Sequence, residues 1–304
     1  MELSWLEDFL ALAAHKTFSR AAELRNVTQP AFSRRIQSLE AWFGTHLFVR
    51  SPHGTELTPA GKFVRIHAEE LTRNLHRVRQ EALEVASKEA SILTIAATHA
   101  LSFVFFPGWI RGHPLFETLG PLNLISDSME ACEQIMLRGE AEFLLCHYHQ
   151  DVVTRFDSSQ FKSIVVGRDV LVPLCVPDEN HKAKWPLPGL STSPSRFLSY
   201  STQSGLGRIL NAVCAKKKAL SLDNVFTGQL AVTLLSMARQ GHGVAWLPET
   251  VAAEDIAAGR LVDPAHGSLS IDVDIRLIRP VHRQSRTAEA FWQAIGDMTA
   301  SERG

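Results

Sequence analysis

The spacing of hydrophobic residues at the start of the chain predicts short helices joined by tight turns. Apolar side chains recur at helical spacing from Trp5 to Ala13, which indicates a first helix. Residues 20–26 predict a second, short helix for which Ser19 is the expected N-cap.

Residues 28–44 predict a third helix with two different faces. Thr28 is a good N-cap, Pro30 falls in the first turn, where its missing N–H costs nothing, and Gly44 ends the helix. One face carries an apolar stripe made of Phe32, Ile36, Leu39 and Phe43. The other face carries the polar side chains of Gln29, Ser33, Arg34 and Gln37. Two helices joined by a tight turn, the second with a polar N-terminal edge, are typical of a helix-turn-helix.

The polar face has the chemistry of a DNA reader. Glutamine offers a base edge both a donor and an acceptor, serine can serve as either, and arginine can bind guanine or phosphate. Residues 46–58 predict two extended pieces around a turn, a wing on which Arg50 can reach a phosphate. From Lys16 to Arg65 there are eight Lys or Arg and three acidic residues, although the whole chain carries a net charge of -1. This local positive excess suits contact with phosphates.

The same pattern also fits an amphipathic helix with a solvated face in another kind of helical bundle. A string of motifs between residues 9 and 61 favours the DNA reader: Ala-Ala, Thr-Gln-Pro-Ala-x-Ser-Arg-Arg-Ile, Leu-Glu, Leu-Phe-x-Arg and Leu-Thr-x-x-Gly. This string resembles the winged helix-turn-helix of LysR-type transcriptional regulators. The resemblance implies contacts with double-stranded DNA by Thr28, Gln29, Pro30, Ser33, Arg34 and Arg50, and Arg35 is a further candidate for phosphate contact.

A long helix is predicted next, capped by Thr58, opened by Pro59 and reaching about Ser87. Its apolar positions alternate spacings of four and three, as in a helix that pairs with another: Val64, Ala68, Leu71, Leu75, Val78, Ala82 and Val85. Packing of this stripe against its own domain is the alternative. The resemblance implies a linker helix that forms a homodimer, or part of a homotetramer, on an interrupted palindrome.

From Ser91 onward, predicted strands and helices alternate, which indicates a parallel sheet. Crossing strands near 163–177 and 270–280 divide this part into two lobes. The expected fold class is therefore mixed: an α-rich winged helix-turn-helix and linker helix, then an α/β, two-lobed effector domain resembling periplasmic binding proteins. The expected boundaries are 1–58 for the DNA-binding domain, 59–88 for the linker helix and 91–304 for the effector domain, with lobe I at 91–163 and 268–304 and lobe II at 164–267.

Ligands of such folds bind between the lobes, at strand ends and helix N-termini. The candidate effector-binding residues follow the predicted strands: Thr98, His99, Ser102, Ser128, Met129, Cys146, His147, His149, Tyr200, Ser201, Thr202, Phe226 and Thr227. None of them is a lysine or arginine. This composition favours a small polar molecule, an oxidised species, or a small anion held by hydroxyl and N–H groups.

The segment Cys146-His147-Tyr148-His149 also suggests a metal site or an enzyme nucleophile. In a strand, however, the two histidines share one face and Cys146 points to the other. The chain has no zinc spacing, P-loop, dinucleotide fingerprint or nucleophile elbow. The sequence therefore predicts a regulator that is not an enzyme and needs neither a metal nor another cofactor.

Residues 96–103, 199–211 and 241–249 resemble the hypochlorite-responsive subgroup of LysR-type regulators. Sensing in that subgroup is attributed to methionine oxidation, but Leu206 and Leu230 stand here where methionines would be sought. A bound ligand is therefore the first hypothesis and oxidation of methionine or cysteine the alternative. The four cysteines form no CxxC, and no apolar run reaches the ~18 residues of a membrane span. The acidic N-terminus does not fit a signal peptide. A cytoplasmic location away from membranes is therefore expected.

Overall fold

The computed structural model describes residues 1–51, 54–86, 92–111, 120–156, 158–190, 192–215 and 220–301. The chain forms two compact units, the first comprising residues 1–86 together with 137–140 and the second the remaining described residues. Each unit is described by itself.

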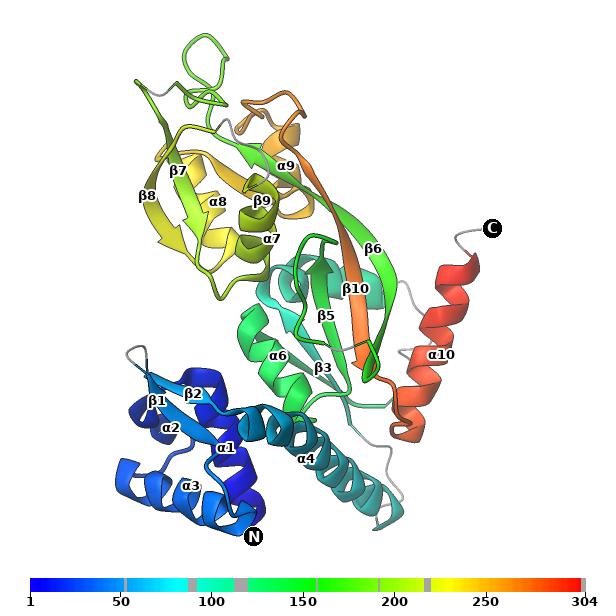
Figure 1. Ribbon diagram of the computed structural model, residues 1–304. Helices are drawn as coiled ribbons and strands as arrows, with labels where there is room; N and C mark the ends of the chain where they lie inside the picture. Colours follow the sequence, from blue (N-terminus) through cyan, green and yellow to red (C-terminus); the bar gives the residue numbers. More distant parts are fainter. Residues whose placement is uncertain are drawn as a thin grey trace. The chain divides into compact units, whose positions relative to one another are not determined.

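The first unit begins with a three-helix cluster and a two-stranded wing (Figure 1). Its elements are α1 (Leu3–His15), α2 (Phe18–Leu24), α3 (Gln29–Phe43), β1 (Phe48–Ser51), β2 (Gly54–Leu57) and α4 (Pro59–Ala86). The buried apolar stripes of the helices meet in one core, which includes Phe9, Leu12, Phe32, Ile36 and Leu39. Strands β1 and β2 pair antiparallel as the predicted wing. The expected helix-turn-helix and wing are thus confirmed.

The helix ends follow the sequence with one correction. Gly44 ends α3 in the left-handed conformation at φ 69°, and the Thr58 hydroxyl accepts a bond from Gly61 N at 3.0 Å at the start of α4. Thr28 is the N-cap of α3, although its side chain makes no capping hydrogen bond. The prediction that Ser19 caps the second helix was wrong: α2 already begins at Phe18, so Ser19 lies inside its first turn.

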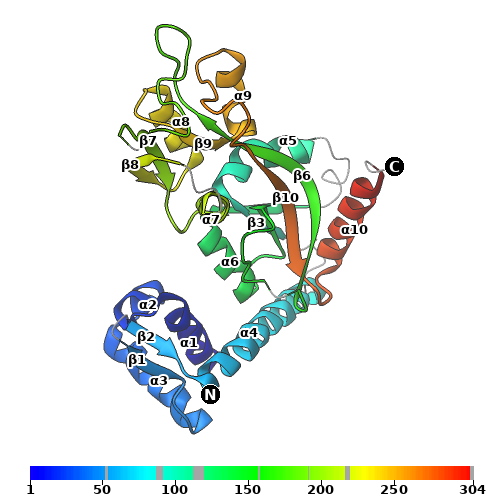
Figure 2. The same ribbon diagram turned by 45° about the horizontal axis from the view of Figure 1, so that its top comes forward.

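After residue 91 strands and helices alternate as predicted (Figure 2). The elements are β3 (Leu93–Thr98), the π-helical η1 (Leu101–Phe105), α5 (Phe106–Arg111), β4 (Leu122–Asp127), α6 (Met129–Arg138), β5 (Phe143–Tyr148), β6 (Phe161–Leu174), β7 (Ser195–Tyr200), α7 (Gly205–Cys214), β8 (Leu222–Gly228), α8 (Ala231–Arg239), β9 (Ala245–Pro248), α9 (Glu249–Ala257), β10 (Ile271–Pro280) and α10 (Arg286–Ser301). Helix α9 was not predicted. The π-helical η1 continues directly into α5.

Six strands form one sheet in the order β4-β3-β5-β10-β6-β9, and β7 and β8 form a separate parallel pair. Strand β3 is parallel to β4 and β5, as the βαβ order requires, whereas β10 is antiparallel to both β5 and β6. The predicted crossing strands are therefore β6 and β10, which run together along the molecule (Figure 1).

Two hydrophobic cores define two lobes in this sheet. Lobe I surrounds a core that includes Ile95, Phe143, Ile275, Leu277 and Phe291. Lobe II surrounds a core that includes Leu171, Leu198, Leu234, Trp246 and Val273. Because β10 supplies Val273 to one core and Ile275 to the other, the paired β6 and β10 connect the lobes as a hinge. The two-lobed α/β architecture is confirmed.

Candidate DNA-reading surface and effector cleft

The N-terminal edge of α3 is exposed as a DNA-reading helix requires. Thr28, Gln29, Pro30 and Arg34 are exposed, and Ser33 is half-buried. Within the described residues, the Arg34 guanidinium has no hydrogen-bond or ion-pair partner. The buried stripe of the same helix anchors it to the core, so these side chains are held at a fixed edge.

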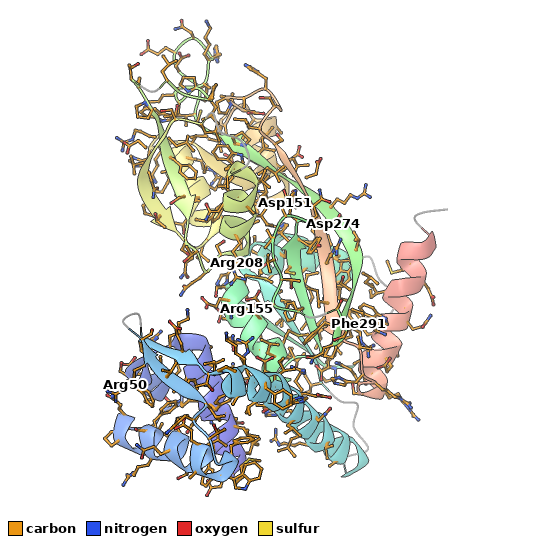
Figure 3. The ribbon with its side chains drawn as sticks, viewed as in Figure 1. Arg50, Asp151, Arg155, Arg208, Asp274 and Phe291 are labelled. Atoms are coloured by element: carbon orange, nitrogen blue, oxygen red, sulfur yellow. The ribbon has the colours of Figure 1, made fainter. Side chains whose placement is uncertain are left out.

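A second exposed arginine lies on the wing. Arg50 is in β1, opposite Thr55 of β2, and its side chain extends from the wing (Figure 3). Its guanidinium is likewise without a partner in the described part of the chain. Arg34 and Arg50 are therefore both available for phosphate or base contact.

Arg35 differs from its neighbour Arg34 because it has an internal partner. Its Nη1 lies 3.3 Å from Oδ2 of Asp8, whose side chain is fully buried beneath α3. Nε of Arg25 donates to the other carboxylate oxygen at 2.8 Å. Asp8 thus ties α1 to the turn after α2 and to α3. Arg35 thus has an internal contact that Arg34 lacks, while its side chain remains 36% exposed.

The expected pairing stripe of α4 divides into a buried and an exposed part. Val64 and Ala68 are buried in the core of their own domain, so their assignment to a pairing surface was wrong. Leu71, Leu75, Val78 and Ala82 remain exposed, whereas the side chain of Val85 lies outside the described residues. The first helical turns are held by the domain, and the apolar stripe becomes exposed further along α4.

In the second unit, a cavity of about 30 Å³ lies between the lobes. Its size suits about two water molecules or a ligand of few atoms. It is lined by Thr98, His99, Ala100, Asp127, Ser128, Met129, His147, Ser204, Gly205, Leu206, Gln229 and Ala231. Five of the candidates, Thr98, His99, Ser128, Met129 and His147, therefore meet at one cavity.

Two helix N-termini face this cavity, α6 after Ser128 and α7 after Ser204. Both serines accept a bond from the first turn, Ser128 from Ala131 N at 3.3 Å and Ser204 from Gly207 N at 3.5 Å. The partial positive charge of a helix N-terminus favours an acceptor or an anion. The Thr98 hydroxyl is buried without a hydrogen-bond partner in the described chain, so it also offers a free polar group.

The remaining candidates of lobe I adjoin the cavity. Ser102 bonds to the carbonyl of His99 at 2.9 Å, and its oxygen lies 2.6 Å from that of Ser126. Cys146 lines a second cavity of about 30 Å³ that shares Met129, His147 and Gly205 with the first. His149 lines the second cavity as well.

The candidates of lobe II do not line either cavity. Tyr200 is buried in the core of lobe II, Thr202 is exposed, and Phe226 packs against that core. Ser201 has a buried hydroxyl, and the Thr227 hydroxyl lies 2.8 Å from that of Ser199. The cavity-lining residues follow further along the chain, Ser204 after the turn that ends β7 and Gln229 directly after β8.

The cavity-lining residues of lobe II that sequence reasoning missed are Ser204, Gly205, Leu206, Gln229 and Ala231. The sequence signal that could have located residues 204–206 is a serine followed by a glycine at the start of a helix. An added Cβ at Gly205 would lie 3.2 Å from Cβ of Met129 across the interlobe contact, so a larger residue would require Met129 to move by a few tenths of an ångström. Leu206, one of the two positions where methionine was sought, is in the cavity wall, and Leu230 lies between two of the lining residues.

A buried polar cluster connects the cavity to the hinge. Nε2 of His147 lies 3.4 Å from Oδ2 of Asp169 on β6, and the Thr250 hydroxyl donates to the same oxygen at 2.6 Å. Burial opposes ionisation, but the hydrogen bonds from His147 and Thr250 hold the pKa of Asp169 below its ordinary value. The Asp169 carboxylate therefore orients the cavity-lining imidazole. Tyr200 is close enough for the charge of Asp169 to add to burial in raising its pKa.

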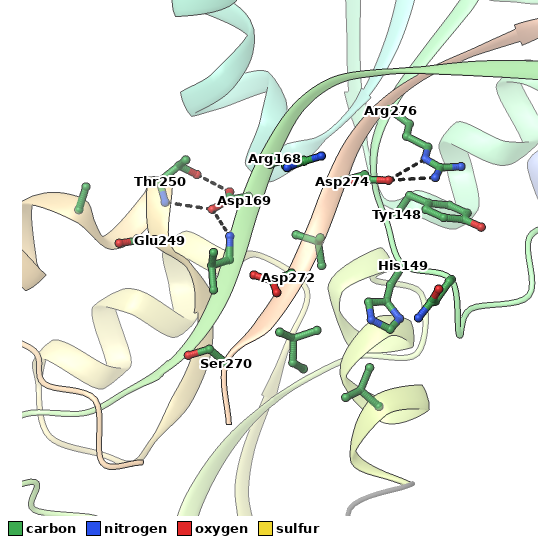
Figure 4. A pocket seen from close by; sticks show the side chains of 16 residues that line it. Tyr148, His149, Arg168, Asp169, Glu249, Thr250, Ser270, Asp272, Asp274 and Arg276 are labelled. Atoms are coloured by element: carbon green, nitrogen blue, oxygen red, sulfur yellow. Dashed lines mark hydrogen bonds and ion pairs between the residues drawn. The ribbon is translucent and has the colours of Figure 1, made fainter. Parts of the chain in front are cut away.

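A hollow of about 1010 Å³, larger than the two interlobe cavities, lies on another face of the hinge (Figure 4). Exposed or half-buried charged side chains line it, among them Arg168, Asp272, Asp274 and Arg276. Arg276 stacks on the Tyr148 ring at 3.5 Å and pairs with Asp274 at 2.9 Å. Of the predicted candidates, only His149 lines this hollow.

The geometry does not favour thiol or metal chemistry at Cys146. Burial raises the pKa of its thiol to about 12, which leaves no thiolate near neutral pH. Among the described residues, no three His, Cys, Asp or Glu side chains are grouped as a metal site. Within that same part of the chain, no helix is long and apolar enough to cross a membrane.

A known family accounts for both units. Residues 3–62 match the bacterial regulatory helix-turn-helix model of the lysR family, and residues 86–300 match the LysR substrate binding domain. The chain belongs to the LysR family of transcriptional regulators. As a LysR-type regulator it combines a DNA-binding helix-turn-helix domain with an effector-binding domain.

Several relatives of this LysR-type regulator share its full length. The HTH-type transcriptional regulator YjiE of Escherichia coli is 30% identical over 298 residues, 98% of this chain and 95% of that protein. The structure of full-length HypT from Salmonella typhimurium, a hypochlorite-specific regulator, is 29% identical, covers 99% of both chains and has a TM-score of 0.60. DarR from Vibrio fischeri, solved in complex with DNA, is 28% identical over 97% of this chain and 98% of its own, with a TM-score of 0.55. The resemblance to the hypochlorite-responsive subgroup is thus confirmed as similarity.

Proposed function

We propose that this regulator reads DNA with Thr28, Gln29, Pro30, Ser33 and Arg34 of α3 and holds a phosphate with Arg50 of the wing. The observation that carries this proposal is the exposed N-terminal edge of α3, where Arg34 has no partner in the described chain while Arg35 is engaged by Asp8. Titration of the protein into duplexes from the region upstream of its own gene tests it. A sequence-specific complex at moderate salt is expected.

We propose that the regulator acts as a homodimer or homotetramer in the cytoplasm, where the chromosome lies, and that it catalyses no reaction. LysR-type regulators are oligomers, and the exposed stripe of α4 offers the apolar surface for pairing. In this proposal residues 1–58 form the reader, 59–88 the linker helix and 91–304 the effector domain. Two readers then bind the two halves of an interrupted palindrome.

We propose that the effector is a small polar molecule or small anion bound in the interlobe cavity. The cavity has two helix N-termini, the Thr98 hydroxyl and the His147 imidazole, and none of the described residues in its wall is a lysine or arginine. These groups suit a compact ligand that accepts hydrogen bonds. A ligand held by both lobes changes the balance between their open and closed arrangements.

A thermal-shift series with small anions and small neutral solutes tests the effector proposal. At least one is expected to raise the unfolding temperature of the wild type, because ligand binding to the folded state stabilises it. Thr98→Val removes the free hydroxyl from the cavity and should weaken that response by about tenfold in concentration, the loss of one hydrogen bond to a ligand. Thr227→Val is the matched control, since its hydroxyl lies outside the cavity. An unaltered response of Thr98→Val contradicts the proposed site.

Oxidation sensing is the second candidate, favoured by the similarity to HypT and by Met129, which lines both interlobe cavities. Burial disfavours the alternative sites: Met136 is inaccessible, and burial raises the pKa of Cys132 to about 12. Peptide mass spectrometry after hypochlorite treatment separates the two mechanisms. Oxidation of Met129 at doses that alter DNA binding supports oxidation sensing, and unmodified methionines and cysteines exclude it.

A further inference from the structure

The two lobes meet at the N-terminal ends of α6 and α7, which lie beside each other in both ribbon views (Figures 1 and 2). Glu130 N donates to the carbonyl of Gln203 at 3.4 Å, and Met129 lies against Gly205. One turn further along, Nη1 of Arg208 on α7 donates to Oε1 of Glu133 on α6 at 2.7 Å. The structure is thus a closed arrangement in which charged side chains join the lobes.

The ion pair between Glu133 and Arg208 is largely buried. The Glu133 side chain is only 1% exposed and that of Arg208 is 21% exposed. Arg155, from the segment after β5, approaches Glu133 at 3.4 Å and Glu130 at 3.5 Å. Figure 3 shows Arg155 and Arg208 at this junction. The two carboxylates and two guanidinium groups balance each other in charge.

Holding the Glu133 carboxylate in this buried position has an energetic cost. Burial raises its pKa, whereas the hydrogen bond and charge of Arg208 lower it. One of its oxygens, Oε2, accepts no hydrogen bond from the described residues. In a buried ion pair the cost of removing both charges from water is close to the gain from their attraction. The pair itself therefore contributes little net free energy to holding the lobes together.

We infer that the Glu133–Arg208 pair is a charge latch that sets the balance between open and closed lobes. Because the intact pair adds little net free energy to closure, a ligand of few atoms that contacts both lobes can shift the populations of the open and closed arrangements. The latch explains how a cavity of about 30 Å³ can control a domain of this size. This inference deepens the proposed function, on which it rests in taking lobe closure as the regulated event.

Amide hydrogen exchange on the full chain tests the latch without DNA or effector. Arg208→Gln leaves Glu133 buried without its closest partner, so exchange in residues 129–138 and 205–214 should rise by about tenfold or more. Exchange in the lobe cores, such as β3 and β10, should stay at the wild-type rate. Arg260→Gln is the matched control, because Arg260 bonds at 2.7 Å to a carboxylate, Asp255, that is also 1% exposed but lies within lobe II alone.

Glu133→Met combined with Arg208→Met provides the second test. An apolar pair of similar volume avoids the burial of charge, so exchange in the two helices should be no faster than in the wild type. Wild-type exchange in Arg208→Gln, or an equal rise in Arg260→Gln, overturns the latch. If Arg208→Gln does not fold, Glu133→Gln takes its place. The exchange experiment can refute the latch while the protein still binds DNA specifically. A failure of the latch hypothesis is therefore distinct from a failure of the proposed function.

Discussion

Leu75→Glu is expected to dissociate the oligomer and to lower affinity for a duplex with two half-sites by about 100-fold. Leu75 is 47% exposed on α4, in the stripe that continues through Leu71, Val78 and Ala82. A glutamate there would bring like charges together in an apolar helix–helix contact. Since linking two modules multiplies affinity by about 10²–10⁴, the separated monomers lose that factor. Native mass spectrometry gives the oligomeric state and gel-shift titration the affinity.

Ile66→Glu is the matched control for Leu75→Glu. Ile66 is 48% exposed on the same helix, but its spacing places it away from the stripe. It should leave both the oligomer and the DNA affinity close to the wild type. Equal effects of the two substitutions would show that α4 does not pair through this stripe.

Asp8→Ala is expected to lower the free energy of unfolding of the DNA-binding domain by about 2–3 kcal/mol. Asp8 is completely buried and bonds to Arg25 at 2.8 Å and to Arg35 at 3.3 Å. Removing a buried ionic partner commonly costs about 3–5 kcal/mol, but the two arginines here are part-exposed and can be hydrated, which reduces the loss. Amide exchange through α1 and α3 should accelerate by about 30–150-fold, the same free energy expressed as a rate.

Glu23→Ala tests whether the effect is specific to the buried carboxylate. Glu23 pairs with Arg20 at 3.3 Å, but its side chain is 67% exposed. An exposed pair of this kind contributes about 0–1 kcal/mol, so exchange should change little. A response to Asp8→Ala as small as that to Glu23→Ala would refute the bridging role of Asp8.

The helix-turn-helix was predictable because its elements depend on local spacing. The stripe from Phe32 to Phe43, the cap at Thr28 and the glycine at 44 lie within one short segment. The bridge from Asp8 to Arg35 was not predictable, since it joins residues 27 positions apart and leaves no periodic pattern. For the same reason, the even spacing along α4 did not reveal that Val64 and Ala68 are buried by their own domain.

The cavity-lining residues of lobe I were predictable from the sequence, whereas those of lobe II lie further along the chain than predicted. In lobe I each strand leads directly into the cavity wall, so Thr98, Ser128 and His147 follow from strand order alone. In lobe II the lining residues come later than predicted: Ser204 follows β7 after a turn, and Gln229 directly follows β8, which extends to Gly228. Arg208 was missed because it lies one turn inside α7, where strand ends give no indication.

Gel-shift titration and footprinting on the region upstream of the regulator's own gene test the proposed DNA reader most directly. Two half-sites separated by whole helical turns of DNA should be protected. Arg34→Ala should weaken this complex by about 1–3 kcal/mol, whereas Lys182→Ala, an equal charge loss in lobe II, should not. Absence of a sequence-specific complex at moderate salt, or wild-type binding by Arg34→Ala, would contradict the proposed DNA reader.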